Sequence, residues 1–230
     1  SGENVVIKEA RPYTNVDENG NEAVGILQLE FEILKMLQDD DVVPKPLDLF
    51  CEWEHAYLVE EYIEGTGIRE VLLEKNRLLN VNPTLSDTEK YYDCFRKIFT
   101  SFNEILKIVH DKGIILGDLS ANNFIIDPDS YTVRLIDLEG AFRVGIDTPT
   151  YMHTPGFRKL QRVLNKSQDF SDDFYTMGVI MFYFLFPIST ISDVKDDVFD
   201  DVLKVMLNDM GWPDKVFDLV NGLIEGRKGY

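Results

Sequence analysis

The sequence is poor in the residues that build disulfide scaffolds and zinc centres. It contains 2 cysteines, Cys51 and Cys94, and 3 histidines among 230 residues. The cysteines lie far apart in the sequence, and neither a CxxC nor an HExxH spacing occurs. This excludes a disulfide framework and gives no pattern for a zinc site. We therefore expect a reducing, cytoplasmic setting.

Basic residues and long apolar runs are also scarce. The 23 Lys and Arg residues face 41 Asp and Glu residues, which gives a formal net charge of −18. An acidic surface repels a phosphate backbone and anionic lipids, so we expect no nucleic-acid partner and no membrane partner. The longest apolar run, Phe174–Phe186, is shorter than the roughly 20 residues that span a bilayer, and it predicts a buried helix.

The first 64 residues predict a small unit of strands and one helix. A short β-branched run is followed by a polar stretch, a helical apolar period, and two further strand-like runs before a glycine-containing break. The expected strands are Val5–Ile7, Leu47–Cys51 and Ala56–Ile63, the helix is Asn21–Gln38, and the break is Glu64–Gly67. The start of the chain runs almost directly into a strand and carries no signal-peptide pattern, so we expect a domain of a longer protein.

The chain beyond residue 64 is predicted to be mostly helical. A long amphipathic helix is expected from Ser86 to His110, with Ser86 as its N-cap and Gly113 as the left-handed residue that ends it. The sequence therefore divides into a small lobe, residues 1–64, and a larger lobe, residues 65–230.

Glu30 interrupts the apolar face of the first helix. At helical spacing it lies in the middle of a stripe that includes Ile26 and Ile33. A carboxylate in that position is costly unless a cation meets it, and Lys8 at the end of the preceding strand is the nearest candidate. The alternative is that Glu30 lies at the solvated margin of the stripe.

A predicted hairpin collects oxygen-bearing side chains. The strand-like runs 124–126 and 133–136 flank an Asp-Pro-Asp-Ser turn. A hairpin centred near residue 130 places Asn123 opposite Asp137, while Asp118 lies in the loop that enters the same end. One amide and two carboxylates form a site suited to Mg²⁺. The alternative is two strand-capping residues and an unrelated acid.

Together these residues resemble the motifs of protein kinases. Asp118 and Asn123 resemble the DxxxxN catalytic loop, and Asp137 resembles the aspartate of the DFG element. Lys8 resembles the lysine of the VAIK strand, and Glu30 resembles its ion-pair partner.

Three further segments follow in the order that a kinase requires. Val59–Ile63 resembles the hinge between the lobes, Thr154–Phe157 resembles the substrate loop, and Asp173–Gly178 resembles the start of the central helix of the large lobe. The resemblance covers nearly the whole chain. It implies an α+β, bilobal protein-kinase-like fold, with a small β-rich lobe bearing one regulatory helix and a larger helical lobe.

The departures from the usual motifs narrow the resemblance. Leu116-Gly117 stands where His-Arg is usual, Ser120 stands where the loop lysine is usual, and the DFG element reads Asp137-Leu138-Glu139. This combination is similar to the kinase domains of class III and IV lanthipeptide synthetases. In those enzymes a lyase domain precedes the kinase and a cyclase domain follows it.

The resemblance implies ATP-dependent phosphorylation of Ser and Thr hydroxyls in a ribosomal precursor peptide with a leader and a core, before phosphate elimination by the lyase. Asp118 would orient the hydroxyl and accept its proton, and Lys8, aimed by Glu30, would bind the nucleotide phosphates. Asn123 and Asp137 would hold Mg²⁺. The remaining nucleotide contacts would come from the main chain of Glu61 and Ile63.

Two features leave other functions open. A glycine-rich phosphate loop should precede Lys8 and does not occur in this sequence, and Ser120 removes a cation from the transferred phosphoryl group. The alternatives are a small-molecule phosphotransferase of the aminoglycoside-kinase type, whose motifs Gly117-Asp118 and Asp137-Leu138-Glu139 also resemble, and a catalytically silent docking module.

Overall fold

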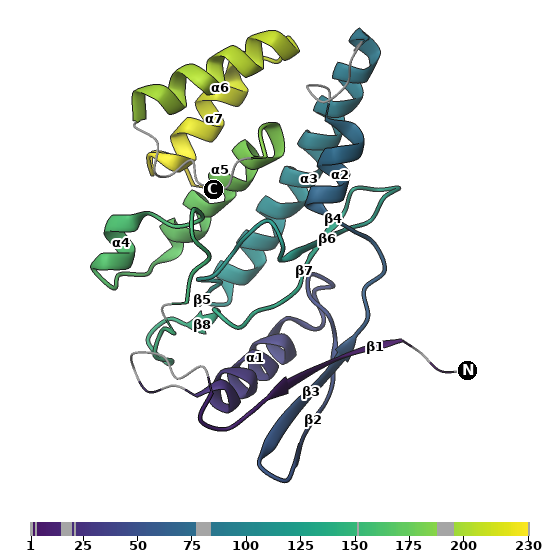
Figure 1. Cartoon of the computed structure of the whole chain (residues 1–230), viewed down its shortest axis with the longest axis vertical. Coiled ribbons are helices and arrows are strands. Elements are labelled where there is room, and N and C mark those ends of the chain that lie inside the picture. Colours follow the sequence, from purple (N-terminus) through teal and green to yellow (C-terminus); the bar gives the residue numbers. More distant parts are fainter. Residues whose placement is uncertain are drawn as a thin grey trace.

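The computed structural model describes residue 2, residues 4–14, residue 20, and residues 22–76, 84–150, 152–187 and 196–229. A strand-rich part and a helical part lie at opposite ends of an elongated molecule (Figure 1). The strands are β1 (Val5–Ala10), β2 (Pro46–Glu52), β3 (His55–Glu61), β4 (Thr66–Gly67), β5 (Ile114–Ile115), β6 (Phe124–Ile126), β7 (Val133–Leu135) and β8 (Phe142–Arg143). The helices are α1 (Ala23–Leu37), α2 (Ile68–Lys75), α3 (Leu85–Asp111), α4 (Leu160–Leu164), α5 (Phe170–Leu185), α6 (Asp196–Met210) and α7 (Asp214–Ile224).

The strand-rich part is an antiparallel sheet in the order β1-β3-β2, with α1 beside it (Figure 1). Side chains alternate between the two faces of a strand, and in β3 the buried ones are Ala56, Leu58 and Glu60. Lys8 of β1 pairs with Leu58, so Lys8 lies on this buried face. The sheet thereby directs Lys8 and Glu60 towards the same interior.

Helix α1 confirms the predicted helix of the small lobe. Its apolar residues recur at helical spacing, and its buried face comprises Ile26, Leu27, Glu30, Ile33, Leu34 and Leu37. Glu30 has only 1% of its surface exposed, so it lies within the stripe and not at its margin. The sequence pattern therefore identified a buried carboxylate correctly.

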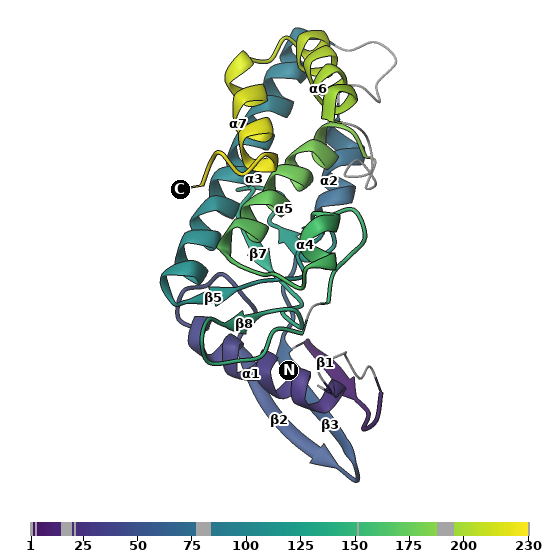
Figure 2. The same cartoon turned by 90° about the vertical axis from the view of Figure 1, so that its left-hand side faces the viewer.

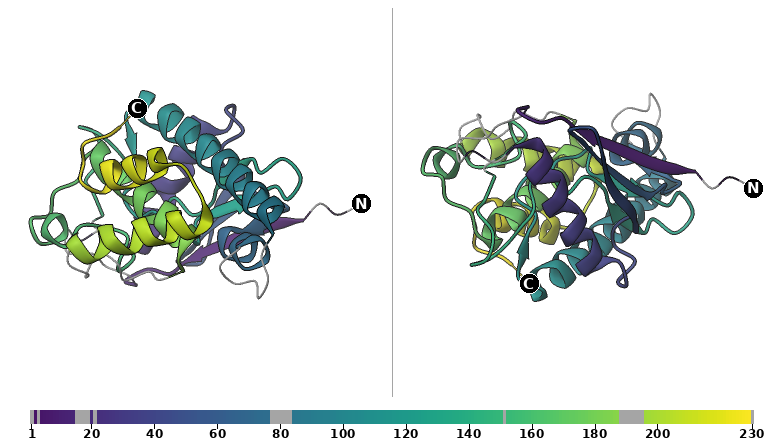
Figure 3. Two further views of the ribbon diagram at one scale, coloured as in Figure 1. Left: turned by 90° about the horizontal axis from the view of Figure 1, so that it is seen from above. Right: turned by 90° about the horizontal axis from the view of Figure 1, so that it is seen from below.

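The helical part is built around α5, which lies among α2, α3 and α7 (Figure 2). Nearly every residue of α5 from Asp172 onward is buried, as its continuous apolar run predicts. The described residues contain no helix that is long and apolar enough to cross a membrane. Viewed along the long axis, α6 and α7 cover one end of the molecule, while α1 and its sheet form the other (Figure 3).

The long helix α3 differs from its prediction at the first turn. Thr84, and not Ser86, is the N-cap, because the Thr84 hydroxyl accepts from the Asp87 amide while the Asp87 carboxylate accepts from the Thr84 amide. The C-terminal prediction is confirmed, since Gly113 has a φ of 73°.

The hairpin of β6 and β7 is real, but its predicted register is wrong by one residue. Phe124 pairs with Leu135, and Asn123 faces Ile136, whose amide donates to the Asn123 carbonyl at 2.9 Å. The turn is responsible, because the Asp127 carboxylate accepts from the amides of Asp129 and Ser130 and so fixes where the strands separate.

Asp173 at the start of α5 anchors the loop that carries Asp118. Its carboxylate accepts hydrogen bonds from His110 Nε2 at 2.8 Å, from the Leu116 amide at 3.0 Å and from the Gly117 amide at 3.2 Å. Asp173 is 1% exposed, so water does not take the place of its carboxylate as the acceptor for these donors when the side chain is removed.

We predict that Asp173→Ala lowers the free energy of unfolding by about 3 kcal/mol, because it leaves buried donors unpaired. The exposed Asp209→Ala on α6 serves as the control and should change stability by less than about 0.5 kcal/mol. Urea unfolding measures both. Equal effects of the two variants would show that Asp173 is not an anchor.

Candidate active site

Lys8 and Glu30 form the ion pair that the sequence predicts. Lys8 Nζ lies 2.6 Å from Glu30 Oε1, and the same oxygen accepts from the Leu138 amide at 2.8 Å. Lys8 Nζ also lies 3.3 Å from Asp137 Oδ1. One ammonium group therefore connects the sheet, helix α1 and the segment that follows β7.

The electrostatics keep Lys8 charged. Burial alone would lower the pKa of Lys8, but Glu30, Asp137 and Glu60 together raise it well above its ordinary value. Burial raises the pKa of Glu30, and Lys8 opposes that shift. The pair is thus stabilised in a setting where either partner alone would be costly.

Asp118 is held by the segment that resembles the substrate loop. Its Oδ1 accepts from the Thr154 amide at 2.7 Å and from the Thr154 hydroxyl at 2.9 Å. Oδ1 accepts both hydrogen bonds from Thr154, and Oδ2 accepts neither of them. The structure therefore brings together two segments that the sequence could only place in order.

Glycine is required where the loop that bears Asp118 meets the turn after Asp137. Gly117 has a φ of 72°, and a Cβ at this position would lie 2.5 Å from the Gly140 carbonyl oxygen. A Cβ at Gly140 would in turn lie 2.5 Å from the Cβ of Asp118. This close approach explains why Gly117 cannot be exchanged for the arginine that regulated kinases carry.

Asn123 and Asp137 lie together in spite of the register shift. Asn123 Nδ2 lies 3.5 Å from the main-chain oxygen of Asp137, and Asn123 Oδ1 accepts from the Ser120 hydroxyl at 2.6 Å. Ser120, noted in the sequence only as a missing lysine, therefore orients Asn123. The Asp137 side chain is 49% exposed, and its residue has a φ of 63°. An amide oxygen and an accessible carboxylate are donors that suit Mg²⁺.

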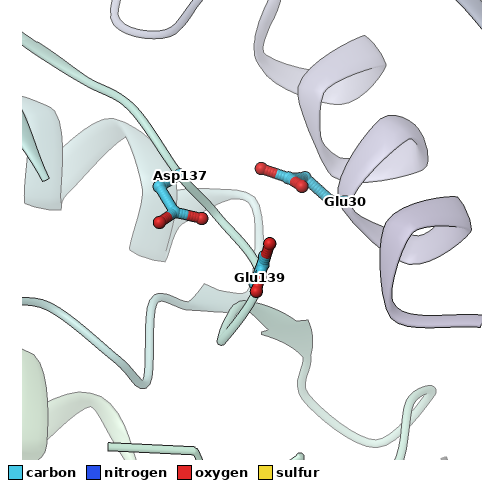
Figure 4. A group of neighbouring side chains, drawn as sticks. All are labelled: Glu30, Asp137 and Glu139. Atoms are coloured by element: carbon cyan, nitrogen blue, oxygen red, sulfur yellow. The ribbon is translucent and has the colours of Figure 1, made fainter. Parts of the chain in front are cut away.

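Glu139 was not among the sequence-predicted site residues. One ligand oxygen each from Glu30, Asp137 and Glu139 lie within 4.8 Å of one another. Figure 4 shows Glu30 reaching from α1 towards the two acids of the turn. Burial raises the pKa of Glu139, and the nearby charges of Asp137 and Glu30 add to the shift. The signal was its position in Asp137-Leu138-Glu139, where glycine is usual.

Glu60 was also missed. It is 3% exposed, and none of the described residues donates a hydrogen bond to its Oε2. Burial raises the pKa of Glu60 to about 7, opposed by Lys8 and reinforced by Glu30 and Asp137. Strand alternation could have found it, because Glu60 falls on the face of β3 that Ala56 and Leu58 bury.

The hinge-like segment is fixed to the hairpin by a bidentate ion pair. The two oxygens of Glu61 accept from Arg134 at 3.2 and 2.9 Å, and Arg134 also donates to the Val43 carbonyl at 2.7 Å. The hydrogen bond from Arg134 lowers the pKa of Glu61. The Glu61 amide donates to the Lys45 carbonyl at 2.9 Å, and Ile63 lies half-buried just beyond β3.

The segment after β8 is held by its own ion pairs. Arg143 donates to both oxygens of Asp147 at 2.7 Å and to Glu32 of α1 at 2.9 Å. These hydrogen bonds lower the pKa of Asp147. The guanidinium group of Arg143 thus connects this segment to the helix that bears Glu30.

We predict that Glu60→Gln becomes more stabilising as the pH rises. Folding raises the pKa of Glu60 from 4.5 to about 7, so its favourable contribution is complete below pH 4.5 and is lost as the pH rises through 7. Relative to wild type, the variant should gain about 2 kcal/mol between pH 5 and pH 8 in urea unfolding. Glu104→Gln, on the exposed face of α3, should show no such trend. A pH-independent difference for Glu60→Gln would contradict the raised pKa.

Several known proteins are similar in sequence to this chain. The chain is 29% identical over 157 residues to the probable SapB synthase of Streptomyces coelicolor. The aligned region covers 68% of this chain and 17% of that protein. It is 28% identical over 213 residues to serine/threonine-protein kinase D of Synechocystis sp., with 85% of this chain and 38% of that protein covered. It is 30% identical over 115 residues to cGMP-dependent protein kinase 2 of Rattus norvegicus, with 49% and 15% covered.

The chain therefore spans less than half the length of each of these relatives. The family described as protein kinase domain matches residues 1–216, which include every residue of the site described above. The α+β fold, with its small strand-rich part and its helical part, agrees with this match. This chain belongs to the protein kinase domain family.

Proposed function

We propose that this domain transfers the γ-phosphoryl group of ATP to Ser and Thr hydroxyls of a lanthipeptide precursor. The observation that carries the proposal is the assembled Lys8–Glu30 ion pair beside Asp137, with Asp118 packed against Gly140 of the turn that follows Asp137. The motif resemblance to lanthipeptide synthetases and the similarity to the probable SapB synthase support the choice of substrate.

Lys8 binds the nucleotide phosphates, and Glu30 fixes the position of its ammonium group. The adenine base of the nucleotide is held by the main chain of the hinge-like segment. Since the Glu61 amide is already bonded to Lys45, the carbonyl of Glu61 and the main chain of Ile63 are the groups assigned to the base. Arg134 keeps this segment in place through its bidentate contact with Glu61.

The oxygens of Asn123 and Asp137 would hold Mg²⁺, which when bound neutralises charge on the nucleotide phosphates. Ser120 orients Asn123 for this role by donating to its amide oxygen. Lys8 restrains one oxygen of Asp137, and the side chain remains accessible to solvent on its other side.

Asp118 orients the attacking hydroxyl and accepts its proton at Oδ2. The amide and the hydroxyl of Thr154 both donate to Oδ1, which leaves Oδ2 for the substrate hydroxyl. Little covalent chemistry is required of the protein, because phosphoryl transfer depends on positioning and charge neutralisation.

The parent protein would place this domain between a lyase and a cyclase domain in the cytoplasm. The precursor peptide, with its leader and core segments, is the partner of this domain. Within the domain, residues 1–64 form the small lobe and residues 65–230 the large lobe, and the nucleotide binds where they meet.

A small-molecule phosphotransferase is the second candidate, and the specific observation that favours it is Glu139. Protein kinases carry glycine at this position, whereas Glu139 here lies beside Asp137. Incubation with labelled ATP and either a Ser/Thr-containing precursor peptide or a panel of aminoglycosides separates the two candidates. Label on the aminoglycosides alone would exclude the peptide kinase.

We predict that Asp118→Asn reduces peptide phosphorylation at least about 100-fold while the affinity for Mg²⁺–ATP stays within about twofold. The reason is that Asp118 acts on the hydroxyl and not on the nucleotide. Turnover is measured by phosphopeptide mass spectrometry and binding by calorimetry, with Asp209→Asn as a control of the same chemistry on the exposed face of α6. Near wild-type turnover of Asp118→Asn would contradict the assignment. A wild-type domain that binds nucleotide without transferring phosphate would instead be a docking module.

We also predict that activity does not require phosphorylation of the segment 140–155. Gly117 supplies no guanidinium for a phosphate, and Asp147 already pairs with Arg143. Phosphatase-treated enzyme should therefore keep its rate, whereas Arg143→Ala should lower it because the segment loses its link to Glu32 and α1. Loss of most activity on phosphatase treatment would refute this explanation.

A further inference from the structure

Three carboxylates converge where helix α1 meets the turn after β7. Oxygens of Glu30, Asp137 and Glu139 lie within 4.8 Å of one another, a spacing that permits a single cation to contact all three (Figure 4). Carboxylate oxygens are the preferred ligands of Mg²⁺ and Mn²⁺. The function proposed above uses only Asp137 of this group as a metal ligand.

Glu30 presents an oxygen whose bonding is incomplete. Its Oε1 is satisfied by Lys8 and by the Leu138 amide, but its Oε2 has no donor among the described residues. Glu30 is 1% exposed, so bulk water does not solvate that oxygen. A buried carboxylate oxygen without a partner is costly, and a cation is one way to satisfy it.

Charge balance points to a divalent ion. Three carboxyl groups face a single ammonium group, that of Lys8, so a divalent ion would balance the two that Lys8 leaves. No other cation of the described residues forms an ion pair with these three acids. Among the residues that the structure describes, none forms a hydrogen bond or an ion pair with the Glu139 side chain.

We propose that Glu30, Asp137 and Glu139 bind a divalent cation, Mg²⁺ or Mn²⁺, independently of nucleotide. This site differs from the Asn123–Asp137 pair assigned to the nucleotide's magnesium, although both use Asp137. Glu139 is the residue specific to it, because it has no other role in the proposed reaction.

The backbone fixes the turn that carries two of the ligands. Asp137 has a φ of 63°, and Gly140 leaves no room for a side chain against Asp118. The Leu138 amide, between the two acids, donates to Glu30 and so holds the carboxylate of α1 against the turn. Glu30 and the turn that carries Asp137 and Glu139 are therefore held together by contacts that do not involve an ion.

Asp137 and Glu139 are both accessible to solvent. Lys8 and Glu139 line a cavity of about 290 Å³, whose other walls include Ile26 and Met152. Asp137 is 49% exposed on its side chain. An ion bound here links α1 to the turn and adds positive charge to a site whose catalytic loop has Ser120 in place of lysine.

The test is a Mn²⁺ titration of the nucleotide-free domain. Electron paramagnetic resonance measures binding as the loss of the signal of free Mn²⁺. Wild type should bind one ion that Mg²⁺ displaces, and Glu139→Gln should weaken binding by about tenfold or more. Glu104→Gln makes the same chemical change on an exposed helix face and should bind as wild type does. Asn123→Ala should keep this ion while it weakens binding of Mn²⁺ together with nucleotide.

Thermal unfolding gives a second measurement, since bound Mn²⁺ should raise the melting temperature of wild type more than that of Glu139→Gln. Unchanged Mn²⁺ affinity in Glu139→Gln overturns the proposal. Wild type that binds Mn²⁺ only with nucleotide also overturns it, and in that case the proposed kinase function stands. Failure of Asn123→Ala and Asp137→Asn to affect nucleotide-linked Mn²⁺ would instead count against the kinase site itself.

Discussion

The buried ion pair between Lys8 and Glu30 is the contact on which the rest of the site depends. Three parts of the chain meet there, because the Leu138 amide shares Glu30 and Asp137 shares Lys8. A buried charge without its partner is strongly destabilising, so this arrangement forms only when the sheet, α1 and the hairpin are all in place. The contacts that complete the small lobe therefore also assemble the site proposed to bind the nucleotide.

The region proposed to bind the nucleotide phosphates is rich in acidic side chains. Glu30, Glu60, Asp137 and Glu139 surround one lysine, and burial raises the pKa of both Glu60 and Glu139. An anionic nucleotide enters such a site only if cations accompany it. The abundance of carboxylates therefore explains why divalent ions are proposed to be required.

In the helical part, Asp173 fixes the position of the loop that carries Asp118. Asp173 holds the amides of Leu116 and Gly117, while Gly117 and Gly140 permit the catalytic loop and the turn to approach each other closely. A guanidinium side chain has no room at Gly117. The ion pair between Arg143 and Asp147 then holds the segment that follows β8.

The sequence by itself predicted the strands and helix of the small lobe, the long helix α3, the β6–β7 hairpin, the buried helix α5 and the buried position of Glu30, because these follow from local periodicity and turn residues. It did not determine the hairpin register, which the Asp127 turn shifts by one residue, or the true N-cap of α3. Only the tertiary structure placed Thr154 on Asp118, Ser120 on Asn123 and Glu139 beside Glu30. Such contacts join segments or orient side chains in three dimensions, and local periodicity carries no information about them.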